Sequence, residues 1–474
     1  MSLILSITTI TQIMKIMPHV FLTGPGVHAE HAGGPPTVPG RAQLQAAGGG
    51  PVSPASLKNW VYGYYASWAG TVADIRWDRV SHVALFDVEL TETGELANTY
   101  LVTDVLEEAL ALAEPYGVRV HIAVICFDDV VMAAVLSDPI KRGLAIDQLQ
   151  ELVDDYGAHG VSVDFEGMNA ANIDDLVAFV EELQAAVPEV TVATPAVDWS
   201  QAYHYPKLAA AADALFIMGY DYHWSGGSPG PVSPLYGGAP WSQWSLEWTL
   251  DDYLATGVDP KKLVMGLPLY GRRWPTTDNS VPGESAGKAT SMVYTATAAE
   301  VGLYERHWDE ITHTPYYFPD GQSQVWYDDV QSLGDKIGWS VDQGMLGVGF
   351  WALNYEGGDP AFWDMVAEHT QVPDPPETGG DSSGRSGDES SGDGSGSGGS
   401  SGGGSGGGET GGGSSAGPGG TGGGSGDAAS SSGADDASTG ARQDGGDDGC
   451  GCAQGGGAGA TIGWAALGLA DRKS

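Results

Sequence analysis

Eight short apolar runs, distributed over about 310 residues, constrain the fold of this chain more than any other feature. Each run is rich in Val, Ile, Leu and Phe, and amphipathic stretches separate most of them. Near-continuous apolar strands that alternate with helices are typical of a parallel sheet covered on both faces. Eight such repeats favour an α/β fold of the closed (β/α)8 TIM-barrel type over an open sheet. The runs are Trp60–Tyr65, His82–Val88, Val118–Ile125, Gly160–Phe165, Val190–Pro195, Ala214–Tyr220, Leu263–Tyr270 and Gly347–Leu353.

One of the separating stretches, from Ile140 to Tyr156, illustrates the helical periodicity. Its apolar residues recur at near-helical intervals and predict one buried face, made of Ile140, Leu144, Leu149, Leu152 and Val153.

The interval between the last two runs is much longer than the others. About 75 residues separate Tyr270 from Gly347, and they include alternating aromatic stretches at Tyr316–Phe318 and Gln324–Tyr327. A loop of this length without secondary structure is uncommon. We therefore predict a small α+β insertion at about 275–340, on the carboxyl-terminal face where a barrel carries its active site.

Composition divides the chain into four parts. Residues 1–56 are expected to be an export leader and a disordered segment, with an alternative start at Met14 that places Lys15 before a short apolar core. Residues 57–371 contain the eight apolar runs and are expected to form the folded domain. Residues 372–449 are Gly, Ser, Asp and Thr with almost no large apolar side chain, which predicts an acidic, flexible linker.

Residues 450–474 have the order of a surface-attachment signal. Cys450-Gly451-Cys452 is followed by an uncharged stretch and then by Arg472-Lys473. The arrangement resembles the sorting tails of myxobacteria-type secreted proteins, which implies an extracellular or cell-surface location and attachment to a membrane or cell surface. A simple tail whose two thiols pair with each other is the alternative reading.

The charge balance excludes one class of partner. The chain carries 61 acidic and 20 basic residues, a formal net charge of −41, so it lacks the clustered cations that nucleic-acid phosphates require. Such acidity is typical either of a highly soluble protein or of one adapted to high salt. Three cysteines are too few for a disulfide-rich fold. No cofactor and no metal site are expected, because the closest histidine set, His28 and His31 with Glu30, lies in the leader. We expect a monomer.

The stretch Gly160–Gly167 carries the chemistry. Strand side chains alternate, so Ser162, Asp164 and Glu166 face one side and the apolar residues face the other. Two carboxyl groups aimed into a barrel are costly unless they meet a polar site at the end of the strand. Neighbouring carboxyls separate their pKa values, so one becomes a proton donor near neutral pH while the other stays charged. This pair predicts general acid catalysis.

These residues resemble glycoside hydrolase family 18, the chitinase-like (β/α)8 enzymes, and the resemblance runs from Trp60 to about Glu368. The family's strand-four signature Asp-x-x-Asp-x-Asp-x-Glu aligns with His159, Ser162, Asp164 and Glu166, so its first two acids are replaced here. The resemblance implies that Glu166 protonates the glycosidic oxygen. It also implies that Asp164 orients the N-acetyl group of the substrate and supports the positive charge that develops there.

Further family motifs follow in order along the chain. Met218-Gly219-Tyr220-Asp221 resembles the Met-x-Tyr-Asp motif, which implies that Tyr220 bonds the attacking acetamide and that Met218 and Asp221 lie against the sugar. The run ending in Arg272 resembles the strand-seven motif and implies a sugar contact for that residue.

The first and last strands carry two tryptophans with family counterparts. Gly349-Phe350-Trp351 resembles the eighth strand, where Trp351 would be the floor on which the reacting sugar stacks. Gly63–Trp68 resembles the first strand, with Trp68 as a platform at the rim.

The resemblance implies a secreted or surface-attached retaining hydrolase of β-1,4-linked N-acetylglucosamine polysaccharides such as chitin, acting by substrate-assisted catalysis. Peptidoglycan is the alternative substrate, because the relaxed strand-four signature and the insertion motifs resemble the spore-cortex glucosaminidases of the family. A non-catalytic, carbohydrate-binding lectin is the alternative of another class, although Glu166 argues for an enzyme.

Overall fold

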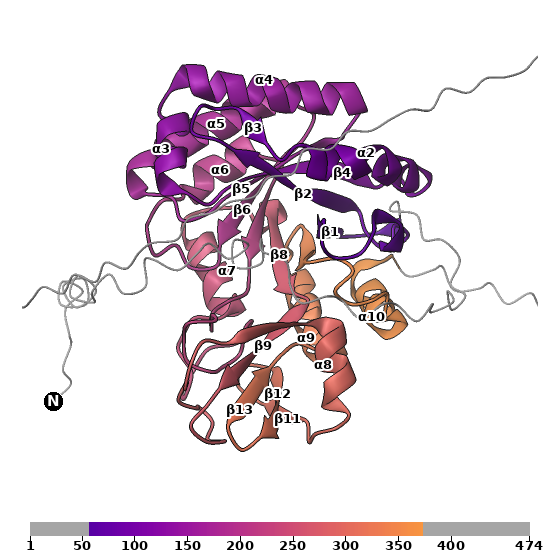
Figure 1. Ribbon diagram of the computed structural model, residues 1–474, viewed down its shortest axis with the longest axis vertical. Helices are drawn as coiled ribbons and strands as arrows, with labels where there is room; N and C mark the ends of the chain where they lie inside the picture. The colour runs from indigo at the N-terminus through magenta and orange to yellow at the C-terminus, as the bar shows by residue number, and fades with distance from the viewer. Residues whose placement is uncertain (1–55, 373–474) are drawn as a thin grey trace, which may run out of the picture. The chain divides into compact units, whose positions relative to one another are not determined.

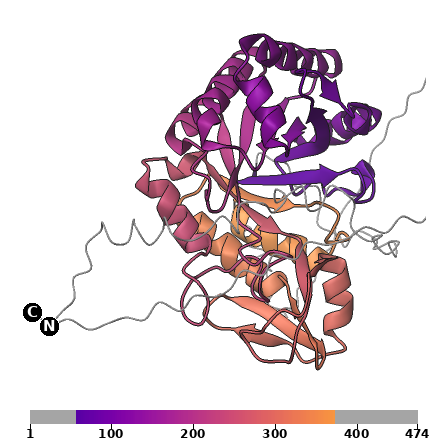
Figure 2. The same cartoon turned by 60° about the vertical axis from the view of Figure 1, so that its left-hand side comes forward.

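The computed structural model describes residues 56–372, and within them eight parallel strands close into a barrel. Each strand pairs with its neighbours in parallel, and pairing of the first two strands completes the ring. Figures 1 and 2 show the strands at the centre with helices outside them. The predicted (β/α)8 barrel is therefore confirmed. Its strands are, in spatial order, β1 (Trp60–Ala66), β14 (Gly347–Trp351), β8 (Leu263–Pro268), β7 (Ala214–Met218), β6 (Val190–Pro195), β5 (Gly160–Phe165), β4 (Arg119–Cys126) and β2 (His82–Leu90), with a short antiparallel β3 (Leu96–Ala97) beside β2.

Helices cover the outside of the barrel and begin at residues suited to cap them. Asp128 and Asp138 accept hydrogen bonds from backbone N–H groups in the first turns of α3 and α4. Gly157 ends α4 in the left-handed conformation, with φ of 73°. The outer helices are α2 (Tyr100–Ala113), α3 (Asp129–Leu136), α4 (Pro139–Tyr156), α5 (Ile173–Ala186), α6 (Tyr205–Ala211), α7 (Leu246–Ala255), α9 (Val330–Asp342) and α10 (Pro360–Thr370).

The buried face of α4 differs from the one predicted. Ile140 is 83% exposed and Leu144 is also exposed. The buried residues are Arg142, Ala145, Ile146, Leu149 and Val153. Arg142 lies on the inward face because its guanidinium donates hydrogen bonds to Glu182 and to the carbonyl of Leu136. Ile140 therefore lies on the face of α4 that is exposed to solvent.

The insertion is a five-stranded antiparallel sheet with one helix, placed between β8 and α9. The apolar run predicted as one strand to Tyr270 is divided, because β8 ends at Pro268 and Tyr270 begins the first strand of the insertion. Figure 1 shows this sheet and α8 beside the barrel strands. Its elements are β9 (Tyr270–Pro275), β10 (Thr290–Val293), α8 (Tyr294–Val301), β11 (His307–Asp309), β12 (Thr314–Asp320) and β13 (Ser323–Trp326).

An aromatic layer fills the middle of the barrel lumen. The ring of Phe216 lies 5.6 Å from that of Tyr62 and 5.0 Å from that of Tyr64. Gly266 and Gly349 make room for it, since a Cβ at either position would come within 2.4 Å of the Phe216 ring. This layer separates polar side chains at the carboxyl ends of the strands from others at the amino ends.

The two ends of the described region meet. Leu57 and Gln371 form an isolated antiparallel bridge, and the N–H of Lys58 donates to the carbonyl of Thr370 at 2.8 Å. Leu57 lies three residues before β1, so this junction lies at the amino-terminal end of the barrel.

The predicted leader, linker and tail lie outside the described residues, apart from Ser56 and Val372. Within 56–372, the helices are too short or too polar to cross a lipid bilayer.

Candidate active site

Asp164 and Glu166 lie at the carboxyl end of β5. Asp164 is 0% exposed and Glu166 is 4% exposed. The N–H of Glu166 donates to the carbonyl of Cys126 at 3.0 Å, which fixes the backbone just beyond the strand to β4. The alternation predicted from the sequence therefore brings two buried carboxyl groups to one end of the barrel.

Buried tyrosines surround the two carboxyl groups. Burial raises the pKa of Tyr64, Tyr203 and Tyr220 well above the usual range, and the negative charges of Asp164 and Glu166 raise all three further. These phenols therefore stay protonated across the physiological range and can donate hydrogen bonds to a substrate or a carboxylate.

Two of these hydroxyls hold β5 in place. Tyr64 and Ser162 share a hydrogen bond of 2.8 Å, and Tyr203 donates to the carbonyl of Phe165 at 2.5 Å. Phe165 lies between the two acids, so Tyr203 fixes the peptide that sets their relative position.

Asp164 is poised to hold a proton. Burial raises its pKa well above the ordinary value for an aspartate. Burial therefore opposes ionisation of Asp164, and a positive charge placed beside it would favour ionisation.

The loop after β7 brings Tyr220 and Asp221 to the same end. The N–H of Tyr220 donates to the carbonyl of Met218, the buried last residue of β7, at 2.8 Å. Asp221 adopts a left-handed backbone with φ of 59°. This turn directs its carboxylate toward the insertion, where Tyr270 donates to it at 2.8 Å.

Arg272 of β9 is the second partner of Asp221. Its Nε donates to Oδ1 at 3.0 Å and its Nη2 donates to Oδ2 at 2.6 Å. Arg272 is only 1% exposed, so its fork fastens the insertion sheet to the end of β7. The predicted sugar contacts of Arg272 and Asp221 stay predictions, and in the free protein the two residues bind each other.

The two predicted tryptophans lie near the ends of β14 and β1. Trp351 is buried, with its ring 4.9 Å from Phe86 and 5.6 Å from Tyr64. Trp68 is half-buried, and its Nε1 donates to the hydroxyl of Tyr355 at 3.0 Å. Trp351 thus belongs to the same aromatic surroundings as Tyr64, whereas the role of Trp68 as a platform stays a prediction.

Asp87 is a further acid at this end that the sequence reasoning did not single out. Burial raises its pKa to about 6, and the nearby charges of Glu89 and Asp164 contribute to the rise. A lone acid within the apolar run His82–Val88 was the signal that could have revealed it.

Replacing Asp87 should stabilise the protein near neutral pH. Its pKa is about 6 when folded and 3.8 as the reference, so the folded protein retains a proton that the unfolded chain loses, and stability falls as the pH rises from about 4 to 6. Asp87→Asn removes this loss. We expect a gain of about 1–2 kcal/mol above pH 6, after allowing for solvent screening.

Urea titrations of both proteins at pH 3.5 and pH 7.5 provide the measurement. The gain should largely disappear at the lower pH, where the carboxyl is mostly protonated in both states. An equal difference at both values would contradict the assigned titration.

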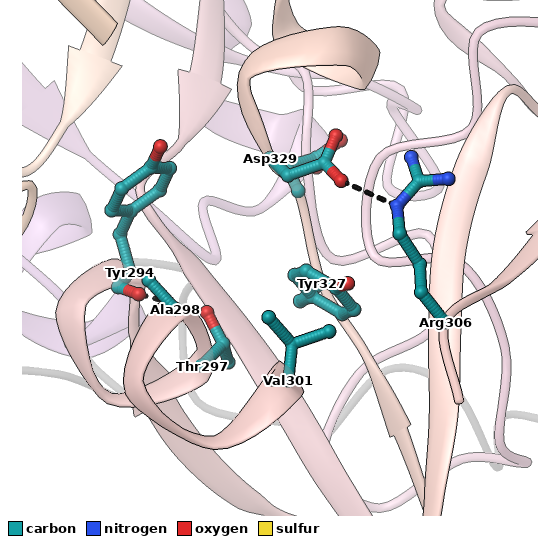
Figure 3. Close-up of a pocket in the computed structure, with 8 residues that line it drawn as sticks. Tyr294, Thr297, Ala298, Val301, Arg306, Tyr327 and Asp329 are labelled. Carbon is teal, nitrogen blue, oxygen red and sulfur yellow. Dashed lines mark hydrogen bonds and ion pairs between the residues drawn. The ribbon is translucent and has the colours of Figure 1, made fainter. Parts of the chain in front are cut away.

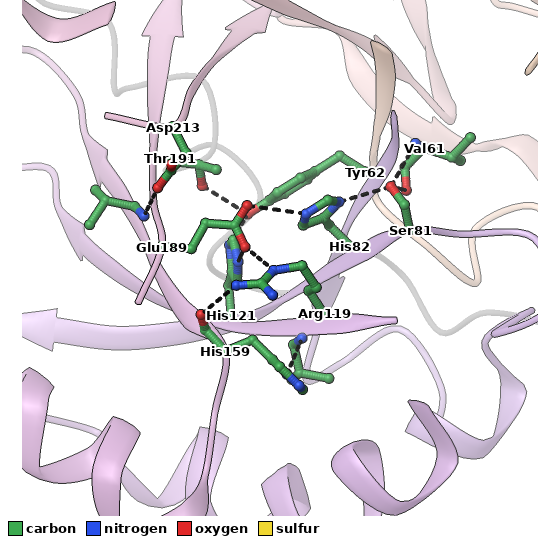
Figure 4. Close-up of polar contacts among 12 residues, drawn as sticks. Val61, Tyr62, Ser81, His82, Arg119, His121, His159, Glu189, Thr191 and Asp213 are labelled. Atoms are coloured by element: carbon green, nitrogen blue, oxygen red, sulfur yellow. Dashed lines mark hydrogen bonds and ion pairs between the residues drawn. The ribbon is translucent and has the colours of Figure 1, made fainter. Parts of the chain in front are cut away.

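A second polar cluster, at the opposite end of the barrel, was also missed. Figure 4 shows His82, His121 and Glu189 converging. His82 and His121 belong to β2 and β4, and Glu189 immediately precedes β6. Burial opposes ionisation of Glu189, but its contacts with the rings of His121 and His82 lower its pKa below the usual range. Burial lowers the pKa of His82 to about 4, so that its imidazole is neutral at pH 7. The three residues are far apart in sequence, so no local spacing indicated them.

A pocket in the insertion lies apart from the predicted site residues. It is lined in part by Tyr294 and Val301 of α8, and by Tyr327. At its edge Arg306 donates from Nε to Asp329 at 2.8 Å (Figure 3). None of the residues predicted to act on a substrate lines this pocket.

A sequence profile described as "Glycosyl hydrolases family 18" matches residues 61–356 of the chain. The match spans the whole barrel from β1 to the loop after β14. It includes the insertion and both carboxyl groups of β5.

Curated proteins of similar sequence are also glycosidases by name. The chain is 27% identical over 308 residues to the "Putative sporulation-specific glycosylase YdhD" of Bacillus subtilis, a match covering 60% of this chain and 68% of that protein. It is 31% identical over 219 residues to mouse Chitotriosidase-1, covering 42% of this chain and 47% of the other. The chain thus spans about half the length of the mouse relative.

Solved structures share the fold. A class V chitinase from Nicotiana tobaccum, solved as a mutant in complex with NAG4, superposes with a TM-score of 0.61 at 19% identity, covering 66% of this chain and 99% of that one. At this level of identity the likeness shows the barrel architecture.

Proposed function

The chain belongs to glycosyl hydrolase family 18 and is a glycosidase of the chitinase-like kind, and from this membership we propose that it is a retaining hydrolase of β-1,4-linked N-acetylglucosamine polysaccharides. Its substrate in this proposal is chitin or a chitin-like polymer. No cofactor takes part in the proposed reaction.

The buried pair Asp164 and Glu166 beside Tyr220 is the observation that supports the proposal. Glu166, at the end of β5 and 4% exposed, is the group that would protonate the glycosidic oxygen. General acid catalysis by a positioned carboxyl group contributes about 10²–10⁴-fold in rate. Tyr203 would keep this acid in position through its bond to the Phe165 carbonyl.

The placement of Asp164 argues against an enzyme nucleophile. Asp164 and Glu166 project from one strand toward the same side, so Asp164 cannot attack the face of the sugar opposite the leaving group. Family 18 uses substrate assistance in place of such a nucleophile. In our proposal the N-acetyl oxygen of the substrate attacks C1 while Glu166 donates its proton to the leaving oxygen.

The resulting oxazolinium ion would be held by Asp164 and Tyr220. Burial favours the neutral form of Asp164 in the free protein, and the positive charge of the intermediate would favour its ionised form. Tyr220 would donate a hydrogen bond to the acetamide. Glu166, now a base, would activate the water that opens the ring, giving net retention.

Substrates without N-acetyl groups should resist cleavage. Fully deacetylated chitin oligomers should be cleaved at least about a thousandfold more slowly than acetylated ones, because the nucleophile is missing. A thiazoline mimic of the intermediate should inhibit. Proton NMR of the first products should show the β anomer; an initial α anomer would exclude the retaining reaction.

Bacterial cell wall is the second candidate substrate. It is favoured by the likeness to YdhD, whose name refers to sporulation, and by the replacement of the first two acids of the strand-four signature with His159 and Ser162. Digestion of chitin oligomers and purified peptidoglycan in parallel separates the two substrates, since a chitinase should release reducing ends at least tenfold faster from chitin.

We place the enzyme outside the cell, attached through its C-terminal segment, on the sequence features of its two ends. Removing residues 373–474 should release the protein into the medium while leaving hydrolysis of soluble oligosaccharides unchanged, because the barrel is complete by Val372. Immunoblots of cells and medium provide the measurement. Full-length protein already free in the medium would contradict attachment.

A further inference from the structure

Three metal-ligating side chains converge at the amino-terminal end of the barrel, opposite Asp164 and Glu166. They are His82, His121 and Glu189, and all three are buried. Each offers one nitrogen or oxygen atom, and these atoms lie within 4.8 Å of one another. Figure 4 shows the two rings directed toward the Glu189 carboxylate.

The spacing of these atoms fits tetrahedral coordination. His82 Nε2 lies 3.4 Å from Glu189 Oε1, and His121 Nε2 lies 3.2 Å from Glu189 Oε2. Zinc bonds of about 2.0–2.1 Å in a tetrahedron place neighbouring ligand atoms about 3.3–3.4 Å apart. The edge between His82 Nε2 and Glu189 Oε1 therefore already has the required length, and the ligand atoms of the three residues all lie within 4.8 Å of one another.

The second ring nitrogen of each histidine, Nδ1, lies within hydrogen-bonding distance of a hydroxyl group. His82 Nδ1 lies 2.8 Å from the hydroxyl of Ser81, and His121 Nδ1 lies 3.2 Å from the hydroxyl of Tyr62. Hydroxyl groups both donate and accept. They can therefore accept from Nδ1–H in the tautomer that leaves each Nε2 lone pair for a metal, which is the arrangement that orients metal-binding histidines.

His82 also has an unsatisfied nitrogen in the structure. Its Nε2 is buried and makes no hydrogen bond with proper geometry, although it faces Glu189. An unsatisfied buried polar atom is costly, and coordination of a cation would satisfy it.

The surrounding chain leaves space for Glu189 to reach the histidines. Gly160 of β5 lies between β4 and β6, and a Cβ there would come within 2.9 Å of the Glu189 Cβ. Arg119 pairs with Oε2 of Glu189, which leaves Oε1 for coordination. The side chain of Arg119 is 39% exposed, so Arg119 lies between the buried cluster and solvent.

We propose that His82, His121 and Glu189 form a binding site for a divalent transition-metal ion of the zinc class, which clamps β2, β4 and β6 at the base of the barrel. Two imidazole nitrogens and one carboxylate oxygen are a donor set that suits Zn²⁺ and Co²⁺. Water would complete the tetrahedron. The site is separate from the proposed catalytic residues, so its test needs no activity measurement.

Co²⁺ titration of the chelator-treated full-length protein tests the proposal. We expect one equivalent of Co²⁺ to produce the intense visible absorption of tetrahedral coordination, Zn²⁺ to displace it, and Zn²⁺ to raise Tm. His82→Gln should lose the absorption and weaken binding at least about tenfold. His159→Gln is the matched control, because His159 lies at the same end but bonds the Val120 N–H through Nδ1.

A second control removes the histidines of the leader. His28→Gln/His31→Gln should keep the full Co²⁺ signal if the barrel holds the ion. Should His82→Gln fail to fold, Glu189→Gln and the stoichiometry of the native protein decide. A native protein that binds no Co²⁺, or an absorption retained in every folded cluster variant, would overturn the proposal.

Discussion

Glu166→Gln should reduce turnover of chitin oligomers by at least about a thousandfold while leaving their affinity within about twofold. The amide keeps the shape of the side chain but cannot deliver a proton to the leaving oxygen. Reducing-sugar release measures turnover, and isothermal titration with a chitin tetramer measures binding. A loss in kcat with unchanged Kd would assign to Glu166 a role that appears only in the transition state.

Glu89→Gln is the matched control. Glu89 is an exposed carboxylate near the carboxyl end of β2, and thus at the same end of the barrel as Glu166. Its replacement should change kcat by less than about twofold. Asp164→Asn should be severe but less so than Glu166→Gln, because it affects the support of the intermediate rather than proton delivery. Equal sugar release by Glu166→Gln and the native protein would favour the carbohydrate-binding alternative.

Lys336→Met should destabilise the protein by about 3–5 kcal/mol, which is a large part of the typical 5–15 kcal/mol for a folded domain. Lys336 of α9 forms an ion pair with Asp328, which follows β13. Both side chains are buried from solvent. Burial lowers the pKa of Lys336 and raises that of Asp328. The charge of each partner opposes the shift that burial causes in the other. Removing the lysine leaves a buried carboxylate without its counter-ion. Urea denaturation at pH 7.5 measures the loss.

Two variants distinguish the pair from simple loss of packing. Lys336→Met/Asp328→Asn should recover most of the stability, because no uncompensated charge remains. Lys207→Met breaks an exposed lysine–aspartate pair with Asp174 and should leave the denaturation midpoint nearly unchanged. A double variant as unstable as Lys336→Met alone would show that the charge of Asp328 is not the cause.

The barrel could be predicted because its strands are buried on both faces. Such strands are continuous apolar runs, and the structure places a strand at each of the eight runs. The predicted run to Tyr270 failed at its end, since β8 and β9 are separated only by Leu269. An apolar run cannot show that the chain leaves one sheet for another when both sheets are buried.

Local alternation was also sufficient to bring Asp164 and Glu166 to one end of one strand. Local alternation could not predict contacts between distant segments. The pairing of Arg272 with Asp221 depends on where the insertion packs against β7. The cluster of His82, His121 and Glu189 depends on barrel closure, which sets side by side residues that the sequence separates by dozens of positions. Ile140 was misassigned because Arg142 is buried against Glu182, a partner on another helix.

The junction of Leu57 with Gln371 has a mechanical consequence. Force applied through the two ends of the described region would pull on this short bridge, which is held by backbone bonds such as that from Lys58 to Thr370. The bridge would open before the load reached any barrel strand. Both ends also leave from the side of the barrel opposite Asp164 and Glu166. Tension applied there would leave the barrel undistorted and the two carboxyl groups in position at its opposite end.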